Sequence, residues 1–417
     1  MINNFMYLLG NKALIASKNR INSKLKNKVL DRYINLIKKN KKIILKQNSK
    51  DIKLATKQKL RKNLIDRLTI DRKKLISICA AIKSVRNLKD PIDVTLEKWK
   101  RPNKLLIKRV SIPLGVIGVI FESRPNVASD ISSLCFKSGN AVILRGGSEA
   151  INSNKILVLL FRKALKMYKV DPNYVQLIEK KNHSYVDFML SNMSKYIDVI
   201  IPRGGKNLVS KVQKLSKVST IGHLEGLCHT YIDKDADLKM ATKIIYNAKL
   251  RNTSICGATE TILMHKKIVK KFCNPILKKL AENKCKIIGD RYLKKYYKGK
   301  ILNAIEKDWS TEYLSATVSV KCVENLEDAI NHVNKYGTMH TDSIITKNKR
   351  AAKIFIKKVK SSIAIHNSST QFADGGEFGF GGEVGISTNK LPPRGPVGLE
   401  QLVSYKYEVL GKGQIRK

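Results

Sequence analysis

The hydrophobic and polar positions follow two patterns along the chain, and the first covers residues 11–90. Apolar side chains there recur at helical spacing, as at Val29 and Tyr33, within a largely polar background. Because residues three to four apart share one face of a helix, this spacing predicts an N-terminal layer of amphipathic helices. Pro91 ends the pattern, and residues 94–110 alternate loosely, which predicts a small β-excursion outside the core.

From residue 116 the pattern changes to short apolar strands that alternate with helices. Strands separated by helices predict parallel β-α-β units with helices on both faces of the sheet. The predicted fold class is therefore α/β. The strands expected in this region are Val116–Phe121, Ala141–Leu144, Val175–Ile178 and Val199–Ile201.

A second α/β region is predicted from about Thr230, with helices around Ile268–Glu282, Ile330 and Ile354. Residues 375–398 are then dense in Gly and Pro, and such a loop lets a backbone approach a ligand or another chain closely. At roughly 100–200 residues per domain, a chain of 417 residues is predicted to form two or three domains.

The charge of the chain raises the question of nucleic-acid binding, because 81 Lys and Arg against 33 Asp and Glu give a net charge of +48. Clustered Lys and Arg neutralise phosphates, but here the basic residues are spread over the whole chain. Arg, which makes bidentate contacts with phosphate and guanine, is much scarcer than Lys. We therefore attribute the charge to compositional drift and predict no nucleic-acid partner.

The seven cysteines are an odd number and include no C-x-x-C pair, so we predict no metal site and a reducing, cytoplasmic compartment. No apolar run approaches the ~18 residues needed to span a bilayer. The first ten residues lack a basic leader and make a poor signal peptide. We predict no association with a membrane.

Two turns with the same tripeptide follow predicted strands of the first region. They are Arg145-Gly146-Gly147 and Arg203-Gly204-Gly205. Glycine lets backbone N–H groups close on a phosphate, and the next helix N-terminus adds its dipole. The turns thus indicate phosphate or dinucleotide binding, and the alternative is a pair of ordinary β-α turns. A G-x-G-x-x-G fingerprint is missing, which disfavours a standard Rossmann dehydrogenase.

Cys256 is the cysteine with the most reactive context. It precedes Gly257 and follows the cationic residues Lys249 and Arg251, and cationic neighbours favour the thiolate, which is the nucleophile. A single cysteine can equally be a small buried apolar residue. No histidine pairs with a cysteine by spacing along the chain, and His223 and His229, six residues apart, do not have the spacing of metal ligands.

Five blocks of the sequence are long, ordered motifs, namely Ile112–Asn126, Gly139–Gly147, Asp198–Gly205, Ser369–Gly376 and Arg394–Leu399. Taken together, they closely resemble the gamma-glutamyl phosphate reductase family, a branch of the aldehyde dehydrogenase superfamily. The resemblance extends over the whole chain and implies an aldehyde dehydrogenase-like fold. It implies an NADP-binding, Rossmann-like domain over residues 1–225, an α/β catalytic domain over 226–380, and a segment, 381–417, that returns to the cofactor domain.

The resemblance implies the reduction of L-glutamyl 5-phosphate to L-glutamate 5-semialdehyde, the second step of proline biosynthesis from glutamate. Cys256 would be the nucleophile that forms a thioester, and NADPH would deliver the hydride. Negative charge develops on the carbonyl oxygen in such reactions, so donors must already point there. Asn126 matches the superfamily's side-chain donor, and the Cys256 backbone N–H would be the other.

The resemblance also assigns residues to the cofactor. Arg145, Gly146 and Gly147 lie where the superfamily holds the adenosine ribose, and an arginine there suits a 2′-phosphate and hence NADP over NAD. Arg203, Gly204 and Gly205 correspond to the pyrophosphate turn. Glu312 corresponds to the carboxylate that holds the nicotinamide ribose, with a solvated loop residue as the alternative. Glu225 lies near the position of the water-activating base of hydrolytic relatives, but this reaction needs no such water.

The chain departs from the family at three positions. Asn252 and Gln371 stand where an arginine is usual, and Pro392 stands where a histidine is frequent, which leaves the substrate affinity in doubt. Three arginines remain as candidate ligands of substrate anions. They are Arg124, Arg251 and Arg394.

The resemblance implies a homo-oligomer in which the excursion at 94–110 and the tail at 402–409 pair between subunits. It also implies functional coupling to glutamate 5-kinase, because the acyl phosphate is labile. Two other readings stay open, another NAD(P)-dependent member of the superfamily and a basic nucleic-acid-binding protein.

Overall fold

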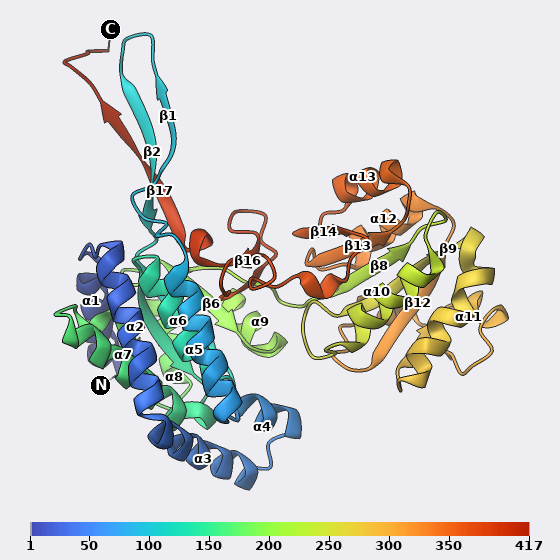
Figure 1. Ribbon diagram of the computed structural model, residues 1–417, viewed down its shortest axis with the longest axis horizontal. Coiled ribbons are helices and arrows are strands. Elements are labelled where there is room, and N and C mark those ends of the chain that lie inside the picture. Colours follow the sequence, from blue (N-terminus) through green and yellow to red (C-terminus); the bar gives the residue numbers. More distant parts are fainter. Residues whose placement is uncertain (1, 417) are drawn as a thin grey trace. The chain divides into compact units, whose positions relative to one another are not determined.

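The computed structural model describes residues 2–416 and divides the chain into two compact units (Figure 1). The first unit runs to Gly222 and also contains Gly379–Gly385 and the chain from Val397 onward. The second unit is formed by His223–Phe378 and Ile386–Pro396. Both units are α/β, which confirms the predicted fold class.

The first unit holds a five-stranded parallel sheet in the order β5-β4-β3-β6-β7. The central strand β3 is buried along its whole length, as expected for a parallel sheet covered on both faces. The predicted strands are confirmed within a few residues. Their bounds are β3 (Val116–Phe121), β4 (Ala141–Gly146), β5 (Val175–Leu177), β6 (Val199–Arg203) and β7 (Ser219–Thr220).

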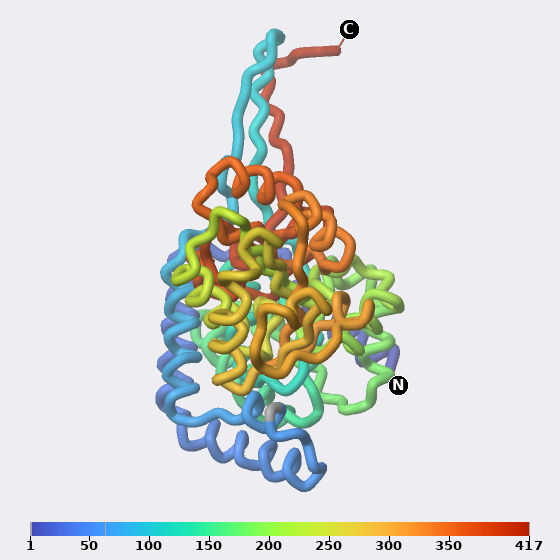
Figure 2. The backbone as a smooth tube through the Cα atoms, turned by 90° about the vertical axis from the view of Figure 1, so that its right-hand side faces the viewer, coloured from blue at the N-terminus to red at the C-terminus, as the bar shows by residue number. Residues whose placement is uncertain are grey.

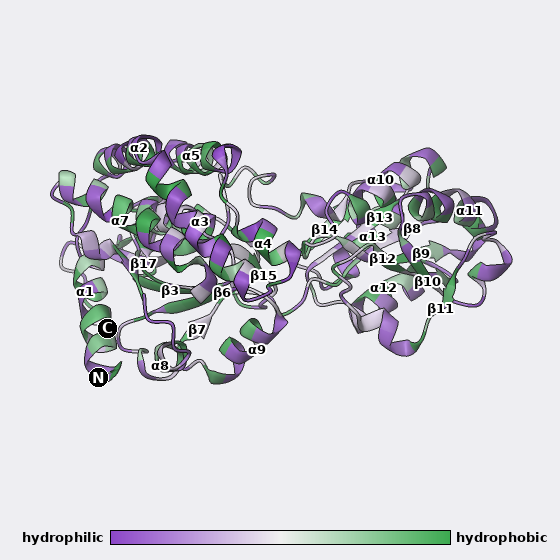
Figure 3. Ribbon diagram, turned by 90° about the horizontal axis from the view of Figure 1, so that it is seen from below, coloured by the Kyte–Doolittle hydropathy of each residue, from purple (hydrophilic) through white to green (hydrophobic). Residues whose placement is uncertain are grey.

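The helices of the first unit include the predicted N-terminal layer. Figure 3 shows α2 and α5 with mixed apolar and polar positions, and side chains of Asn22 and Asp71 cap their N-termini by accepting N–H groups. The bounds are α1 (Ile2–Ser17), α2 (Ser23–Lys39), α3 (Lys41–Lys57), α4 (Lys62–Leu68), α5 (Arg72–Asn87), α6 (Asn126–Lys137), α7 (Ile151–Met167), α8 (Ser184–Asn192) and α9 (Lys206–Leu215).

Helix α1 is a correction to the sequence analysis, which began the helical layer near residue 11. The helix starts at Ile2 because Met6, Leu9 and Ala13 form a buried stripe in the core of the unit.

The β-excursion is also present, as strands β1 (Thr95–Lys100) and β2 (Leu106–Pro113). Strand β17 (Val403–Leu410) pairs antiparallel with β2, in the order β1-β2-β17. Figure 2 shows these segments side by side, as a narrow ribbon. The sequence analysis placed this pairing between subunits, but the two segments pair within one chain.

The second unit holds a seven-stranded parallel sheet in the order β11-β10-β12-β9-β8-β13-β14. Alternate residues of its strands face opposite sides, so Ile232 and Ile262 pack under α10 and α11 while Tyr231 and Leu263 pack under α12 and α13. The strands are β8 (Cys228–Ile232), β9 (Thr259–His265), β10 (Lys286–Gly289), β11 (Leu302–Asn303), β12 (Thr317–Val323), β13 (Thr341–Ile345) and β14 (Ile363–His366). The helices are α10 (Leu238–Leu250), α11 (Lys266–Glu282), α12 (Leu326–Tyr336) and α13 (Lys349–Lys358).

Two further short strands, β15 (Gly385–Ser387) and β16 (Gly395–Val397), lie where the chain passes from one unit to the other. Within residues 2–416, no helix has both the length and the apolar character needed to cross a membrane.

Candidate active site

Cys256 lies in the loop that joins α10 to β9, within the second unit. It is partly exposed, whereas Cys228 and four other cysteines are buried. The loop packs closely against the turn that contains Gly226, where an added Cβ would lie 2.4 Å from the Cβ of Cys256. A glycine is therefore required at position 226 for the two segments to approach.

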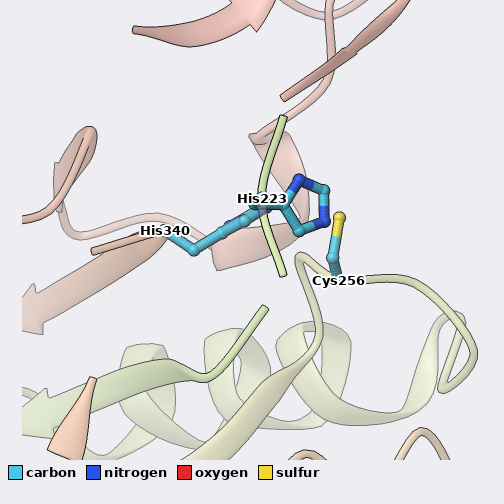
Figure 4. A group of neighbouring side chains, drawn as sticks. All are labelled: His223, Cys256 and His340. Carbon is cyan, nitrogen blue, oxygen red and sulfur yellow. The ribbon is translucent and has the colours of Figure 1, made fainter. Parts of the chain in front are cut away.

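Two imidazoles face the thiol, from His223 and His340. One ring nitrogen of each histidine and the Cys256 sulfur all lie within 4.8 Å of one another. Figure 4 shows the three side chains as neighbours, with an imidazole ring beside the Cys256 sulfur. The sequence analysis found no histidine paired with a cysteine by spacing along the chain, and the structure brings the two histidines to Cys256 from distant parts of the sequence.

The electrostatics of the site favour a thiolate at Cys256. Burial raises the pKa of this thiol, but the charges of His340 and His223 and the interaction of the sulfur with the His223 ring outweigh burial and set the pKa well below the ordinary value. The neighbouring thiol of Cys228 shows the opposite behaviour, since burial and nearby carboxylates hold its pKa well above the ordinary value. Cys228 donates a hydrogen bond to the Cys256 carbonyl, with a sulfur–oxygen distance of 3.0 Å, and so supports the loop.

The cationic residues that the sequence suggested as activators of Cys256 have other partners. Lys249 forms an ion pair with Glu260, and both side chains are completely buried. Burial raises the pKa of Glu260 to about 7, against the effect of Lys249. The pair joins the end of α10 to the start of β9 and thereby closes the base of the Cys256 loop.

Glu260 also connects this loop to the segment that contains Glu312. Its Oε1 accepts the N–H of Leu314 at 3.2 Å, while Oε1 of Glu312 accepts the N–H of Gly226 at 2.9 Å. Burial raises the pKa of Glu312, the Gly226 N–H lowers it, and the Cys256 thiolate raises it further. Glu312 is thus held beside the nucleophile, and Glu225 lies in the adjoining turn.

Gln371, one of the departures from the family, has a defined role in the loop. Its amide nitrogen donates to the carbonyls of Ala248 at 2.8 Å and Asn252 at 3.3 Å. Its Oε1 accepts Nε of Arg251 at 2.8 Å. The side chain is buried, and it orients the exposed guanidinium of Arg251, a candidate substrate ligand.

The remaining second-unit candidate, Arg394, is exposed and donates Nε to the hydroxyl of Ser362 at 3.2 Å and a terminal nitrogen to the carbonyl of Lys360. Asn252 accepts the N–H of Ser254 at 3.1 Å, so it shapes the turn before the nucleophile. Pro392 is exposed.

In the first unit, the two Arg-Gly-Gly turns end strands β4 and β6, which lie on either side of β3, at the carboxyl edge of the sheet as predicted. A Cβ on Gly147 would lie 2.1 Å from the Glu149 carboxylate, and one on Gly204 would lie 2.6 Å from that of Glu122. The N–H of Gly205 donates to the same Glu122 carboxylate at 2.9 Å. A turn whose backbone N–H binds an anionic oxygen, as that of Gly205 does, suits a phosphate-bearing cofactor.

The two arginines of these turns differ. Arg145 is buried, and its guanidinium donates to the carbonyls of Gly146 and, at 2.9 Å, Lys181. Burial lowers its pKa, while Glu149 opposes that shift. Arg203 is partly exposed and forms an ion pair with Glu383 at 3.1 Å.

Asn126, the predicted oxyanion donor, begins α6, and its amide donates to Oδ2 of Asp130 at 2.9 Å. This bond fixes the orientation of the amide. Arg124 lies two residues earlier, before the same helix and also partly exposed. Both residues belong to the first unit.

The similarity to known proteins agrees with this site. A family model described as the aldehyde dehydrogenase family matches residues 19–292. The gamma-glutamyl phosphate reductase of Bartonella quintana (strain Toulouse) is 46% identical over 396 residues, which cover 95% of this chain and 96% of that protein. The chain belongs to the gamma-glutamyl phosphate reductases of the aldehyde dehydrogenase family. As a member of this family it is an oxidoreductase, and the family uses NAD(P).

Solved structures of the gamma-glutamyl phosphate reductase family support the assignment. The enzyme from Thermotoga maritima is 37% identical, with a TM-score of 0.96 and 99% of each chain covered. An acetylating aldehyde dehydrogenase from Geobacillus thermoglucosidasius, 14% identical with a TM-score of 0.71 over 99% of this chain and 98% of that chain, shares the fold. The resemblance predicted from the sequence motifs is confirmed.

The histidines that the sequence analysis missed could have been found from strand order. His223, Cys256 and His340 come shortly before β8, β9 and β13, which are neighbours in the sheet, and Glu312 comes shortly before β12. Because the strands are parallel, residues that precede neighbouring strands meet at one edge. The signal therefore lies in the order of the strands and not in spacing along the chain.

Proposed function

We propose that this protein reduces L-glutamyl 5-phosphate to L-glutamate 5-semialdehyde and phosphate, with NADPH as the reductant and a thioester on Cys256. The observation that supports this most directly is the contrast between two neighbouring thiols. Cys256 has a pKa well below the ordinary value beside two imidazoles, whereas Cys228 has a pKa well above it. The members of the family named above point to the substrate.

The chain's own residues account for each step. The Cys256 thiolate attacks the acyl carbonyl, so a C–S bond forms, the C–O bond to phosphate breaks and phosphate leaves. When bound, NADPH supplies the hydride that adds to the thioester carbon. The C–S bond then breaks, the carbonyl of the aldehyde re-forms, and the electron pair returns to the Cys256 sulfur. Asn126 and the Cys256 N–H would stabilise the negative oxygen at both tetrahedral stages.

The remaining site residues divide by unit. We assign Arg145, Gly146 and Gly147 to the adenosine ribose and 2′-phosphate, and Arg203, Gly204 and Gly205 to the pyrophosphate. In the second unit we assign Glu312 to the nicotinamide ribose. The arginines Arg124, Arg251 and Arg394 are assigned to the carboxylate and phosphate of the substrate. The Gly205 N–H, which binds an anionic oxygen in this structure, supports the pyrophosphate assignment, and the ordered Arg251 supports the substrate assignment.

We further propose that the protein works as a homo-oligomer built through the β1-β2-β17 ribbon. The ribbon exposes several large apolar side chains in one small sheet, among them Leu96, Tyr407 and Val409, and such side chains gain stability when a second copy covers them. Sedimentation at micromolar concentration tests this proposal, and a 47 kDa species under those conditions contradicts it.

The chemistry also suggests the setting of the reaction. Acyl phosphates hydrolyse readily, so a kinase acting on the carboxylate, here glutamate 5-kinase, must supply this one close to the enzyme. All seven cysteines are free, and a reducing compartment such as the cytoplasm would keep Cys256 as a thiol.

Running the reaction backward tests the function. We expect NADP reduction with pyrroline-5-carboxylate, the cyclic form of the semialdehyde, only when inorganic phosphate is present, because phosphate must release the acyl group from Cys256. Sulfate serves as the control anion. NADP reduction without phosphate would instead identify another type of aldehyde dehydrogenase.

A further inference from the structure

The Cys256 thiol, His223 and His340 form one cluster, and the two imidazoles have no assigned role in the reaction. The three side chains come from the N-terminal ends of β9, β8 and β13, which are neighbouring strands. The sulfur and one nitrogen of each ring lie within 4.8 Å of one another (Figure 4). A thiol this close to two imidazoles can pass its proton to one of them, and the hydrogen bonds of the rings show which one.

The tautomer of His223 is fixed by the backbone. Its Nδ1 lies 2.7 Å from the carbonyl oxygen of Ile386. A carbonyl can only accept a hydrogen bond, so Nδ1 bears the hydrogen and the lone pair of the neutral ring lies on Nε2. This is the arrangement of a base that a third group orients.

His340 is less suited to hold the proton. It is completely buried, and its Nε2 makes no hydrogen bond with any described residue. Its Nδ1 lies 2.9 Å from the hydroxyl oxygen of Thr341 and 3.5 Å from the sulfur of Cys228. A cation buried in this way is costly, whereas His223 is partly exposed.

The two imidazole rings are also too close together for both to carry a positive charge. Their centroids lie 4.9 Å apart in an edge-to-face contact, and two positive imidazoles at that distance would repel. The pair therefore has room for only one positive charge, and His223, the less buried ring, is the better place for it.

The charged groups around the cluster agree with this assignment. Glu312 and Glu225 act on one another, and Glu312 also acts on Cys256 and His223. Such carboxylates stabilise an imidazolium and oppose a thiolate. Lys249 is already paired with Glu260, so the imidazoles are left to supply the positive charge beside the sulfur.

We propose that His223 is the catalytic base of this enzyme, taking the proton of the Cys256 thiol on Nε2 and passing it to the departing phosphate. The inference rests on the proposed function and deepens it. Phosphate released from an acyl phosphate dianion needs one proton, and the hydride step and breakage of the C–S bond return Cys256 as a thiolate. His223 then regains a proton from water, so one proton is consumed for each NADPH oxidised.

The rate at which iodoacetamide alkylates Cys256 tests the assignment without any substrate. We would measure it by mass spectrometry from pH 5 to 9 in EDTA, so that no metal ion occupies the cluster. His223→Asn keeps an amide donor for the Ile386 carbonyl but has no proton acceptor. Its alkylation rate at pH 6 should fall on the order of tenfold, and its inflection should move toward the ~8.5 of a free thiol.

Two further variants make the result decisive. His223→Gln should repeat the shift, and His366→Asn, an exposed histidine at the end of β14, should match the wild type. A larger shift in His340→Asn than in His223→Asn would make His340 the base and overturn the proposal. An unchanged profile in both His223 variants would also overturn it, provided that their thermal unfolding resembles that of the wild type.

Failure of the inference and failure of the proposed function can be told apart. The wild type could show no phosphate-dependent NADP reduction while the His223 variants still shift the alkylation profile. In that case His223 remains the base of Cys256, and the proposed substrate is wrong. If the reaction is present and the profile does not move, only the role of His223 is lost. Wild-type alkylation that rises strongly when EDTA is added would point to a metal ion on the cluster, and that result contradicts the proposal.

Discussion

The two units of this protein hold their functional groups in different ways. In the first unit, each candidate cofactor site is one tripeptide that ends a single strand, β4 or β6. In the second unit, the site combines groups that precede four neighbouring strands and lie as far apart in the chain as His223 and His340. Cofactor binding should therefore tolerate changes that stop the chemistry, and the following predictions test that separation.

The largest effect is expected from removing the nucleophile. Cys256→Ala should lower turnover by roughly 10⁴-fold or more while leaving the dissociation constant for NADPH within a few-fold, because the sulfur contributes only to the chemical steps. Steady-state kinetics and fluorescence titration with NADPH measure the two quantities.

Cys322→Ala is the matched control, since Cys322 is the other partly exposed cysteine and burial raises the pKa of its thiol to about 12. This variant should keep wild-type turnover. If Cys256→Ala keeps its turnover, Cys256 is not the nucleophile, and the contrast drawn between the two units is wrong.

The next effect concerns the substrate. Arg251→Ala should raise the KM for the acyl phosphate roughly 10- to 100-fold and leave the KM for NADPH unchanged, since a charge-assisted hydrogen bond contributes about 1.5–3 kcal/mol. Gln371→Ala should raise the same KM less, because Arg251 remains but loses the partner of its Nε.

Gln371→Arg sharpens this test. It restores the residue usual in the family but places a second cation beside Arg251 and loses the acceptor for its Nε, so we expect no gain in affinity. Arg291→Ala, an exposed arginine of the same unit, is the control. A lower KM in Gln371→Arg would show that Gln371 weakens substrate binding.

The first unit was the easier one to predict from the sequence. Val116–Phe121 and Ala141–Leu144 are apolar runs bounded by turn residues, so local patterns are sufficient to locate the strands and the glycine turns after them. Cys256 was singled out by the cationic residues that precede it in the sequence, and the family resemblance then assigned it the role of nucleophile. His223 and His340 were missed because strand order, which depends on packing across the whole sheet, brings them together.

The contacts of the polar and charged side chains could not be predicted from the sequence either. Lys249 precedes Cys256 by seven residues and looked like its activator, but burial pairs it with Glu260. Gln371 looked like a lost anion ligand, but it orders the Cys256 loop. In both cases the partner depends on which side chains are buried together, which spacing along the chain does not reveal.

A smaller effect is expected from the cofactor turn. Arg145→Ala should raise the KM for NADPH about tenfold and leave that for NADH nearly unchanged if the guanidinium binds the 2′-phosphate. The guanidinium donates to two carbonyls in this structure, so a purely structural role would raise both KM values equally.

Arg162→Ala is the matched control for Arg145, because its guanidinium is also partly buried and donates to a carbonyl, that of Val175, at 2.9 Å. If it affects both cofactors as Arg145→Ala does, the effect comes from packing in the first unit and not from recognition of the 2′-phosphate.

The smallest effect concerns Asp130, which binds the amide of Asn126. Burial raises the pKa of Asp130 to about 6, while the Asn126 amide lowers it, and Oδ1 has no hydrogen-bond partner among the described residues. A carboxyl whose pKa is higher in the folded state than the ~3.9 of the unfolded chain binds extra protons when folded. Its contribution to stability is full below about pH 4 and is lost as the pH rises through 6.

Asp130→Asn should remove this pH dependence, because the amide does not titrate and its oxygen can still accept from Asn126. Relative to the wild type, the variant should gain on the order of 1 kcal/mol of stability between pH 4 and pH 8, and the melting temperature should follow by a few degrees. Thermal unfolding curves across that range measure the difference. Parallel curves for the two proteins would show that Asp130 is ionised at pH 5, and turnover that falls with the substitution would show that the charge of Asp130, and not only its hydrogen bond, positions Asn126.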